Sequence, residues 1–510
     1  MSLNEKSRTE NAKRNAIFAV AKKLVTLVLV LISRKFFIKY IGVEYLGING
    51  LFANVLTLLS LVDLGIGTAM NVSLYKPIAE KDTKTLAAII GYFKKIYWGI
   101  AAAVTVVGLG LIPFLKYIVN MDQDIPHLYL YYIIMVGRNA FSYLFAYKSS
   151  IISADQKSST VDNVEICFNV IKTILQIVAI IIFRNFLVYL ILDVLYVIAR
   201  NLMVTYVSDR EYPFIKEKVE LDGDEKKRIR SNLFSLGIYR ISYVALNGTD
   251  NILMSIMIGT VYVGMYSNYY SIANNIEAML GLIFMALTPS IGNLVATSKG
   301  KDIFRVFNQA QIASFWISGV VCAGLAFLMQ DFITLWLGEN MLLDKNTVAA
   351  IVLYQFYAIC MRPIWIFREG TGMYRQIRYI MLVTAGLNIV LSIVLGKYMG
   401  LSGILFATTI ANMLTCFLYE PRVLFKTFLN TKPIVYYKNY FINVLLTLSG
   451  MVLCYFALRR LTEVSVVMFI IKGIICVLIM SAIYFIRYFK TPEFKELVEK
   501  VLSLITKKQG

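Results

Sequence analysis

Long apolar segments alternate with short polar segments along almost the entire chain. A helix needs about 20 apolar residues to cross the hydrocarbon core of a bilayer, and about fourteen segments come close to that length. They cover residues 15–38, 47–74, 86–115, 126–150, 163–183, 186–207, 232–257, 262–294, 306–330, 347–367, 376–396, 401–424, 437–458 and 465–486. Two of them, 47–74 and 262–294, exceed one span, and tilt, a kink at Pro289 or an interfacial extension would absorb the excess. The pattern predicts an all-α, polytopic membrane protein with about 14 transmembrane helices.

The composition agrees with a membrane protein and excludes several other classes. Of the 510 residues, 58% are hydrophobic and 16% are charged, whereas a soluble protein has about 25% charged residues. The six cysteines lie in apolar segments without a CxxC motif, so they are predicted to be reduced packing residues. His127 is the only histidine, which excludes a histidine-based metal site. No hydrolase, P-loop or dinucleotide motif is present, so we expect neither an enzyme nor a bound cofactor.

The net charge of +20 is distributed unevenly between the two predicted membrane surfaces. With the N-terminus inside, the segments after even-numbered spans are cytoplasmic, and they carry basic residues such as Lys81, Lys157, Lys227, Arg368 and Lys432. The basic residues in the segments after odd-numbered spans are only Lys39, Lys116, Arg184, Lys345, Lys397, Arg459 and Arg460. Because cytoplasmic loops collect Lys and Arg, both termini are predicted to be cytoplasmic. The same rule explains the basic excess without nucleic acid as a partner.

A polar linker and a sequence repeat divide the predicted helices into two lobes. Residues 208–231 carry both charge signs and follow the sixth span. The segments Ile41–Gly47 and Ile258–Gly264 both read IGxxY(L/V)G, and they follow the first and the seventh span. A repeat that recurs after six helices keeps its orientation, so we predict parallel repeats related by an axis along the membrane normal.

The predicted organisation ends in an amphipathic tail. It comprises a six-helix lobe at 1–207, a cytoplasmic linker at 208–231, a second six-helix lobe at 232–430, two additional transmembrane helices at 431–490 and a tail at 491–510. Pro492 marks a helix start, and apolar residues from Phe494 to Ile505 share one face, with charged residues such as Glu496 opposite. Such a helix is predicted to lie on the cytoplasmic membrane surface.

Ionisable side chains inside the predicted spans are the candidate functional residues. Each costs about 2.5–3.5 kcal/mol at the bilayer centre, so such residues usually line water or pair with one another. They are Lys22, Lys23, Arg34, Asp63, Arg138, Asp193, Arg200, Arg240, Asp250, Glu277, Arg362 and Lys472. Arg138, Arg240 and Arg362 lie deepest in their spans, and we assign them to a substrate cavity.

Helical spacing places further residues on the same polar faces. Lys23 and Arg34 are eleven positions apart, close to three full turns. Three more stripes occur in other predicted spans. In the seventh span, Arg240, Asn247 and Asn251 share a face, with Asp250 at its edge. In the eighth span, Ser267, Ser271 and Asn274 share a face flanked by Glu277, and in the tenth span Gln355 lies on one side with Arg362. Polar stripes on apolar membrane helices face protein or water. We therefore predict that Arg34, Lys23, Asn247, Asn251 and Asn274 join the arginines in one wet central cavity.

Structural explanations stay open for several of these residues. Lys22 and Lys23 could mark the inner boundary of the first span, which would place Arg34 deeper. Asp193 and Arg200 could be a structural pair or interface residues as readily as a site. Lys472, in the last span, is more simply an interfacial or packing residue.

The deep charge is mostly basic, and this sign favours an anionic cargo. A phosphate or carboxylate restores the interactions that buried arginines lose through desolvation. Asp63, Asp250 and Glu277 fit two roles, as counter-ions of the arginines or as binding sites for a driving H⁺ or Na⁺. The residues themselves favour neither role.

Two parts of the chain resemble a known family. One runs from Gly42 to Phe52 as GVEYLGINGLF and continues in 61–67 and 73–77; the other runs from Thr249 to Leu253 as TDNIL and continues in 259–269. Both resemble the Wzx-type polysaccharide repeat-unit flippases of the multidrug/oligosaccharidyl-lipid/polysaccharide superfamily. The resemblance extends over both lobes and includes the span count.

The resemblance implies a MATE-like fold with two six-helix lobes around a central cavity and two extra C-terminal helices. It implies alternating-access transfer of undecaprenyl-diphosphate-linked oligosaccharides across the bacterial cytoplasmic membrane, for capsule or O-antigen biosynthesis. Membrane lipids, a polysaccharide polymerase and chain-length proteins are the further partners that it suggests. Family positions carry over best to Asp63 and Asp250, whereas the arginine assignments rest on the spacing argument.

Two other functions compete with this one. A MATE-like antiporter of cationic drugs would need an acidic, aromatic-lined cavity, whereas the deep charge here is mostly basic. A membrane enzyme acting on the same lipid-linked sugars would carry large external loops. The longest predicted external loop, near Met329–Val348, is short.

Overall fold

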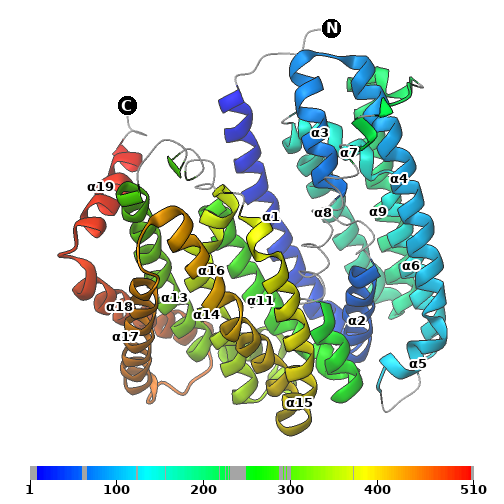
Figure 1. The fold of residues 1–510 in the computed structure, drawn as a ribbon. Coiled ribbons are helices and arrows are strands. Elements are labelled where there is room, and N and C mark those ends of the chain that lie inside the picture. Colours follow the sequence, from blue (N-terminus) through cyan, green and yellow to red (C-terminus); the bar gives the residue numbers. More distant parts are fainter. Residues whose placement is uncertain are drawn as a thin grey trace. The chain divides into compact units, whose positions relative to one another are not determined.

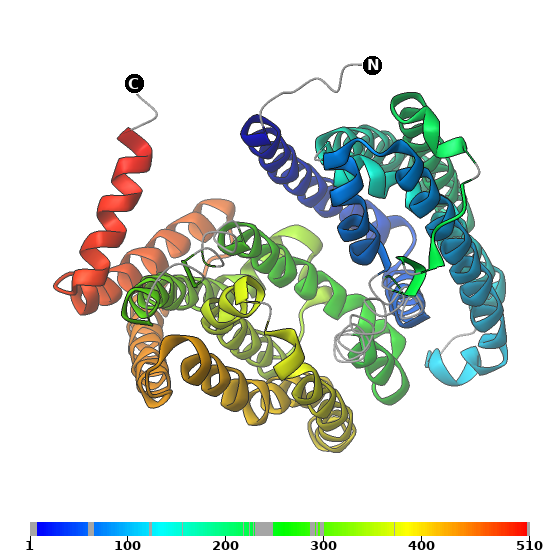
Figure 2. The same cartoon turned by 45° about the horizontal axis from the view of Figure 1, so that its top comes forward.

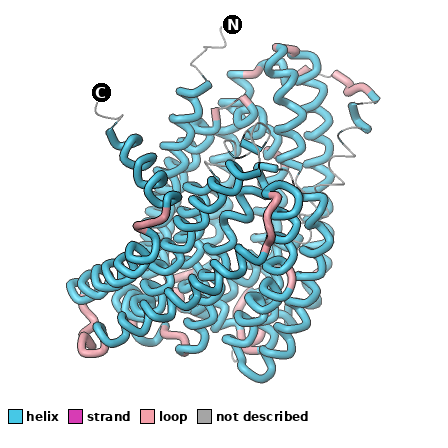
Figure 3. The backbone as a smooth tube through the Cα atoms, turned by 60° about the vertical axis from the view of Figure 1, so that its left-hand side comes forward, coloured by secondary structure: helices cyan, strands magenta, loops and turns pink. Residues whose placement is uncertain are grey.

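The computed structural model consists of helices and their connections throughout the part of the chain that it describes (Figure 1, Figure 3). It describes residues 8–506 except 60–65, 122–124, 156, 218, 224, 228, 230–247, 286–290, 292–293, 296–299 and 372. By their contacts the residues form two compact units, Met1–Gly264 and Met265–Gly510, which we call the first and the second unit.

The first unit brings together helices that are far apart in the sequence. Its elements are α1 (Arg8–Tyr40), α2 (Val43–Leu59), α3 (Ile66–Glu80), α4 (Thr83–Gly110), a 3-10 turn (Ile112–Phe114), α5 (Leu115–Ile118), α6 (Leu128–Tyr143), α7 (Ala146–Ala154), α8 (Ser158–Phe183), α9 (Phe186–Glu211) and a second 3-10 turn (Pro213–Lys216). α1 packs along α8, α8 along α9, and α9 against α6. These contacts connect α1, α8, α9 and α6 in a row, and the charged residues described below lie on this row.

Large aromatic side chains hold the remaining helices of the first unit. Phe52 of α2 and Tyr132 of α6 are fully buried, and their rings meet edge to face with centroids 5.0 Å apart. A second cluster around Phe93 of α4 joins α3 and α7. Each buried aromatic ring removes a large apolar area from the surroundings, so these contacts fix the helix positions.

The second unit is organised around one long helix. Its elements are α11 (Thr260–Met285), which begins in the first unit, α13 (Gly300–Leu337), a 3-10 turn (Glu339–Met341), α14 (Lys345–Thr371), α15 (Tyr374–Leu414), α16 (Cys416–Leu424), a π-helical turn (Phe425–Leu429), α17 (Ile434–Leu458), α18 (Val466–Tyr488) and α19 (Pro492–Thr506). α13 contacts α14, α17, α18 and α19, and Figure 2 shows the orange and red C-terminal helices beside the green α13. The two predicted additional helices, α17 and α18, are therefore integral parts of this unit.

Most described helices coincide with predicted spans, and two of the predicted spans each correspond to two helices. The prediction of an all-α polytopic membrane protein is confirmed, and eight helices among the described residues are long and apolar enough to cross a membrane. The overlong segment 47–74 corresponds to α2 and α3, and the segment 126–150 to α6 and α7. The count of 14 spans stays a prediction, because most of 232–257 lies outside the described residues.

α15 is a helical hairpin that contains two of the predicted spans. A straight helix of its 41 residues would be roughly 60 Å long, twice the hydrocarbon thickness. Gly400 has φ 62° and ψ −138°, a conformation open only to glycine, and it reverses the chain. The side chains of Asn388 and Thr408 then meet at 2.9 Å. The predicted boundary between 376–396 and 401–424 coincides with this turn.

The two copies of the IGxxY(L/V)G motif have matching backbones. Gly42 and Gly259 both have a positive φ, 109° and 134°. At each copy the N–H groups of the isoleucine and the glycine donate to one carbonyl, that of Phe37 in the first copy and that of Met254 in the second. Each motif therefore ends a helix in the same way, because only glycine adopts this conformation without strain.

Residues after the predicted linker are tied to the first unit. The Asn120 N–H donates to the Thr260 hydroxyl at 3.0 Å, and the Ser255 hydroxyl donates to the Ile118 carbonyl at 2.7 Å. The division by contacts therefore falls inside α11 and not at 208–231. The lobe boundaries derived from the linker stay a prediction.

The predicted amphipathic tail forms α19, and it packs on α13. Glu496, on the charged face, accepts a hydrogen bond from Gln309 at 2.7 Å and lies 3.6 Å from Arg305. On the apolar face, the ring of Phe494 stacks on Trp316 with centroids 5.6 Å apart. The sequence pattern predicted only a membrane contact for this helix, because its packing partner is almost 200 positions away.

Candidate functional site

The predicted site residues that the structure describes are divided between the two units. Asp63, Arg240 and Asn247 lie outside the described residues. Lys23, Arg34 and Arg138 belong to the first unit together with Asp250 and Asn251, and Asn274, Glu277 and Arg362 belong to the second.

Arg138 of α6 forms an ion pair in the first unit. Its Nε lies 2.5 Å from Oδ2 of Asp193 on α9, a charge contact without hydrogen-bond alignment. The other carboxylate oxygen of Asp193 accepts from the Lys172 ammonium of α8 at 3.4 Å. One carboxylate thus holds two cations that come from two other helices. Lys172 was not among the predicted candidates, although it is an ionisable residue inside the predicted span 163–183.

A second group of ion pairs lies on α1, α8 and α9. The Lys22 ammonium donates to Asp162 and to Glu165, both at 2.9 Å. Glu165 also lies 3.7 Å from Arg200 of α9. Of the two adjacent lysines of α1, Lys22 therefore carries the ion pairs, and the described residues include no ion-pair partner for Lys23.

The suggested pairing of Asp193 with Arg200 is not found. Asp193 binds Arg138 and Lys172, whereas Arg200 contacts Glu165 and donates to Asn201 at 2.8 Å. Their spacing of seven places both on one face of α9, but the neighbouring helices supply closer partners. Helical spacing predicts which residues share a face and not which helix lies opposite.

Arg34 of α1 belongs to the same row of charges. It lies close to Tyr189 of α9, and Tyr189 in turn lies close to Asp193 and Arg138. Counted over the described row, the cations Lys22, Arg34, Arg138, Lys172 and Arg200 outnumber the anions Asp162, Glu165 and Asp193. These eight described residues therefore keep a surplus of positive charge even after their ion pairs form.

The polar residues around the second motif occupy different environments. Asp250 and Asn251 are half-buried in a helix of the first unit, and Asn251 Oδ1 has no hydrogen-bond partner among the described residues. Asn274 of α11 is exposed. These positions are compatible with a polar surface, and their assignment to one cavity stays a prediction.

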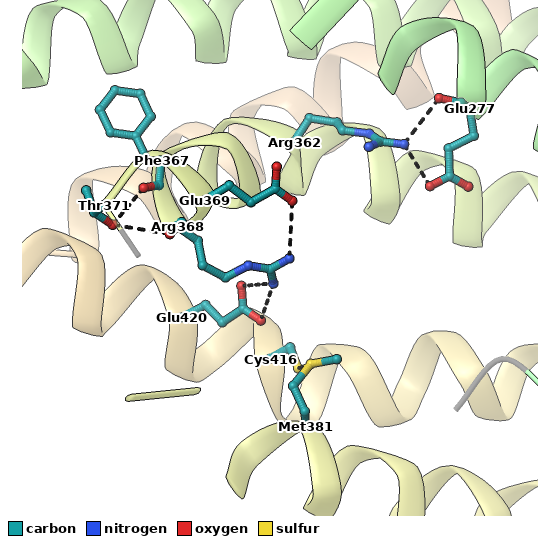
Figure 4. A network of polar contacts seen from close by, with 9 residues as sticks. All are labelled: Glu277, Arg362, Phe367, Arg368, Glu369, Thr371, Met381, Cys416 and Glu420. Carbon is teal, nitrogen blue, oxygen red and sulfur yellow. Dashed lines mark hydrogen bonds and ion pairs between the residues drawn. The ribbon is translucent and has the colours of Figure 1, made fainter. Parts of the chain in front are cut away.

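Arg362 of α14 is paired with Glu277 of α11 in the second unit (Figure 4). Its Nη2 donates to Glu277 Oε1 at 2.8 Å and to the Glu277 carbonyl at 3.2 Å. The guanidinium also lies 5.4 Å from the centre of the Trp365 ring. Glu277 is thus positioned as a counter-ion to this arginine.

A second pair, Arg368 with Glu420, was missed by the sequence argument. Arg368 Nη1 donates to both carboxylate oxygens of Glu420 at 3.2 Å (Figure 4). Their side chains are only 8% and 1% exposed. By sequence, Arg368 falls in the polar segment after the tenth predicted span, whereas α14 continues to Thr371 and buries this side chain. The available signal was Glu420, a carboxylate inside the predicted span 401–424.

Lys472 of α18 has the packing role that its position suggested. Its ammonium donates to Asp331 of α13 at 2.6 Å, and its side chain is 8% exposed. The pair joins an additional helix to the long helix of the second unit. Among the described residues, no group of three or more His, Cys, Asp or Glu side chains could hold a metal ion.

The fold is that of membrane transporters with low sequence identity to this chain. The chain is similar to the lipid II flippase MurJ in an inward closed conformation, with 17% identity, a TM-score of 0.68, and coverage of 93% of this chain and 100% of that chain. It is also similar to an inward-facing MATE multidrug resistance transporter of the MOP superfamily (15% identity, TM-score 0.59, coverage of 81% and 99%). A MOP superfamily transporter from Pyrococcus furiosus, described as having a binding pocket of reverse polarity, matches with 13% identity, a TM-score of 0.55, and coverage of 84% and 98%.

The family follows from the sequence itself. Residues 12–295, more than half of the chain, match the family described as polysaccharide biosynthesis protein. The chain therefore belongs to this family and is a multi-pass membrane protein with a MATE-like fold. No curated protein matches the chain.

Proposed function

We propose that this protein flips undecaprenyl-diphosphate-linked oligosaccharide repeat units across the bacterial cytoplasmic membrane. The transfer proceeds by alternating access and supplies a surface polysaccharide of the capsule or O-antigen type. The observation that carries the proposal is the cation surplus on α1, α6, α8 and α9 in a membrane protein of a polysaccharide biosynthesis family.

The chemistry of the cargo explains why such a surplus is useful. An isolated ion in hydrocarbon costs tens of kcal/mol, so a diphosphate cannot cross unassisted. Arginine and lysine compensate that cost through charge-assisted hydrogen bonds. The polyprenyl tail is apolar and can remain in the lipid while the head group crosses. The passage therefore needs a wet, cationic lining only for the head group.

The site residues take their roles from this scheme. Arg138, Arg240 and Arg362, with Arg34 and Lys23, contact the diphosphate, while Asn247, Asn251 and Asn274 contact the sugars. Asp63, Asp250 and Glu277 act as counter-ions or as H⁺ or Na⁺ sites. The pairing of Glu277 with Arg362 at 2.8 Å supports the counter-ion role for this residue.

The proposed flippase function is tested by measuring lipid-linked intermediates in cells. In a strain that lacks the protein, mass spectrometry should find complete single repeat units on undecaprenyl diphosphate, confined to the inner leaflet. Complementation with the wild-type chain should remove them, whereas Arg138→Ala and Arg240→Ala chains should not, at equal membrane abundance. Normal surface polymer in the deletion strain would contradict the proposal.

The same strains distinguish the flippase from the rival function, a small-molecule antiporter. A MATE-like small-molecule antiporter would make the deletion strain more sensitive to cationic drugs without accumulation of lipid-linked sugars. Drug susceptibility that is unchanged, together with accumulated repeat units, favours the flippase.

A further inference from the structure

Asp193 occupies the centre of a site made by two other helices. Its Oδ2 contacts Arg138 of α6 at 2.5 Å, and its Oδ1 contacts Lys172 of α8 at 3.4 Å. Each oxygen of the carboxylate therefore has its own cation. A phosphate group can bind the same two cations, because it accepts the same charge-assisted hydrogen bonds as a carboxylate.

The cluster is partly exposed, and not all of its donors are used in hydrogen bonds. The side chains of Arg138, Lys172 and Asp193 are 33%, 19% and 19% exposed. No hydrogen bond from either terminal nitrogen of Arg138 is found within the described part of the chain, so these donors remain for a ligand. Lys172 is held additionally by the Tyr196 ring, whose centre lies 4.5 Å from the ammonium.

We propose that Asp193 is an internal anion that occupies the Arg138–Lys172 site when no cargo is bound. The ligand of this site is the phosphate ester of the lipid-linked cargo, so the inference rests on the proposed function. When a phosphate arrives, it takes the two cations over from the carboxylate. Asp193 then repels the bound phosphate, and this repulsion keeps the affinity low enough for release on the other side.

The Asp193 carboxylate has two opposing effects on phosphate binding. The larger of the two decides whether removal of the carboxylate raises or lowers the affinity. Asp193 orients the two cations, which favours binding, and it adds a like charge beside the phosphate, which disfavours binding. Orientation is partly maintained without it, because Tyr196 also holds Lys172. The charge repulsion is not replaced by anything and is strong in a partly buried site. Removal of the charge should therefore strengthen phosphate binding and, by slowing release, weaken transport.

The test measures binding and export separately. The full-length protein in nanodiscs is titrated with radiolabelled farnesyl diphosphate by equilibrium dialysis, with inorganic pyrophosphate and farnesol as separate probes. Asp193→Asn should bind farnesyl diphosphate about tenfold more tightly than wild type, the scale of one like charge removed at close range. The same variant should export less polymer in cells. Arg138→Gln and Lys172→Met should bind more weakly than wild type.

Matched variants distinguish this role from a structural one. Asp193→Glu keeps the charge and should retain wild-type affinity. Asp302→Asn removes a carboxylate from an exposed pair with Arg305, and it should leave the affinity within about twofold. Equal or weaker binding by a correctly folded Asp193→Asn protein would overturn the inference, as would absence of binding in every chain. Binding of pyrophosphate as tight as that of farnesyl diphosphate would overturn the lipid head group as the ligand.

A failure of the Asp193 inference can be distinguished from a failure of the proposed flippase function. The accumulation of lipid-linked repeat units in the deletion strain involves only the presence or absence of the wild-type chain. That result stands whatever Asp193→Asn does to the affinity.

Discussion

Gly47 and Gly264 occupy the same place in the two copies of the IGxxY(L/V)G motif, and each lies against the backbone of the other copy. A Cβ on Gly47 would overlap the Thr260 carbonyl oxygen, and a Cβ on Gly264 would lie 2.6 Å from the Val43 carbonyl oxygen. Thr260 holds the position in its motif that Val43 holds in the first. The contact is therefore reciprocal, as expected for two copies related by a local twofold axis.

Alanine at Gly47 should destabilise the protein. The added methyl group meets backbone atoms that cannot rotate away, and overpacking of this kind costs about 1–3 kcal/mol or more. We expect a lower thermal unfolding midpoint, measured by fluorescence-detected size exclusion of the solubilised protein. Gly99→Ala is the matched control, because no atom lies within 4 Å of its Cβ. A Gly47→Ala protein as stable as Gly99→Ala would contradict the close approach.

Variants of Arg362 and Glu277 should show whether this pair has a structural role or a role in transport. Either single variant, Arg362→Gln or Glu277→Gln, leaves one charge without its partner. The side chains of Arg362 and Glu277 are 15% and 23% exposed. The loss of folding stability in either single variant should therefore lie between about 1 kcal/mol, as for an exposed pair, and about 3–5 kcal/mol, as for a fully buried one.

The double variant decides between the roles. Arg362→Gln with Glu277→Gln removes both charges and should recover much of the stability. Polymer export should remain lost if Arg362 contacts the cargo, which surface-polymer blots of membranes with equal protein content would reveal. Restored export in the double variant would make the pair purely structural.

The pair of Arg368 and Glu420 should behave in the opposite way. Both side chains are buried, so Arg368→Met or Glu420→Gln alone should cost about 3–5 kcal/mol and lower the amount of protein in the membrane. An apolar double variant, Arg368→Met with Glu420→Leu, should recover both the amount and the export. Folded double-variant protein that fails to export would instead give this pair a role in transport.

Substitution of Gly400 should disturb the α15 hairpin. Its φ of 62° with ψ −138° is accessible to glycine alone, so Gly400→Ala should cost about 1–3 kcal/mol. Gly386→Ala, in the same hairpin and with open space around its Cβ, should be neutral or slightly stabilising. The comparison of their unfolding midpoints checks the turn, and equal midpoints would argue against it.

Local sequence determined the helices because hydropathy and chain-breaking residues act over short distances. The boundary near Gly400 and the shared ends at Gly42 and Gly259 follow from glycine's conformational freedom, and the span limits follow from the apolar length that a bilayer needs. The candidate residues Arg138, Glu277 and Arg362 were found in the same way, as ionisable groups in apolar segments. None of these inferences required knowledge of which helices touch.

Only the tertiary structure decided the partners. Asp193 faces Arg138 and not Arg200, Arg368 is buried against Glu420, and Glu496 of the tail lies on α13. Spacing along one helix defines a face, but the charge opposite that face comes from another helix, many positions away in the chain. Ion pairing is a short-range interaction in space, so its partners are set by how the helices pack.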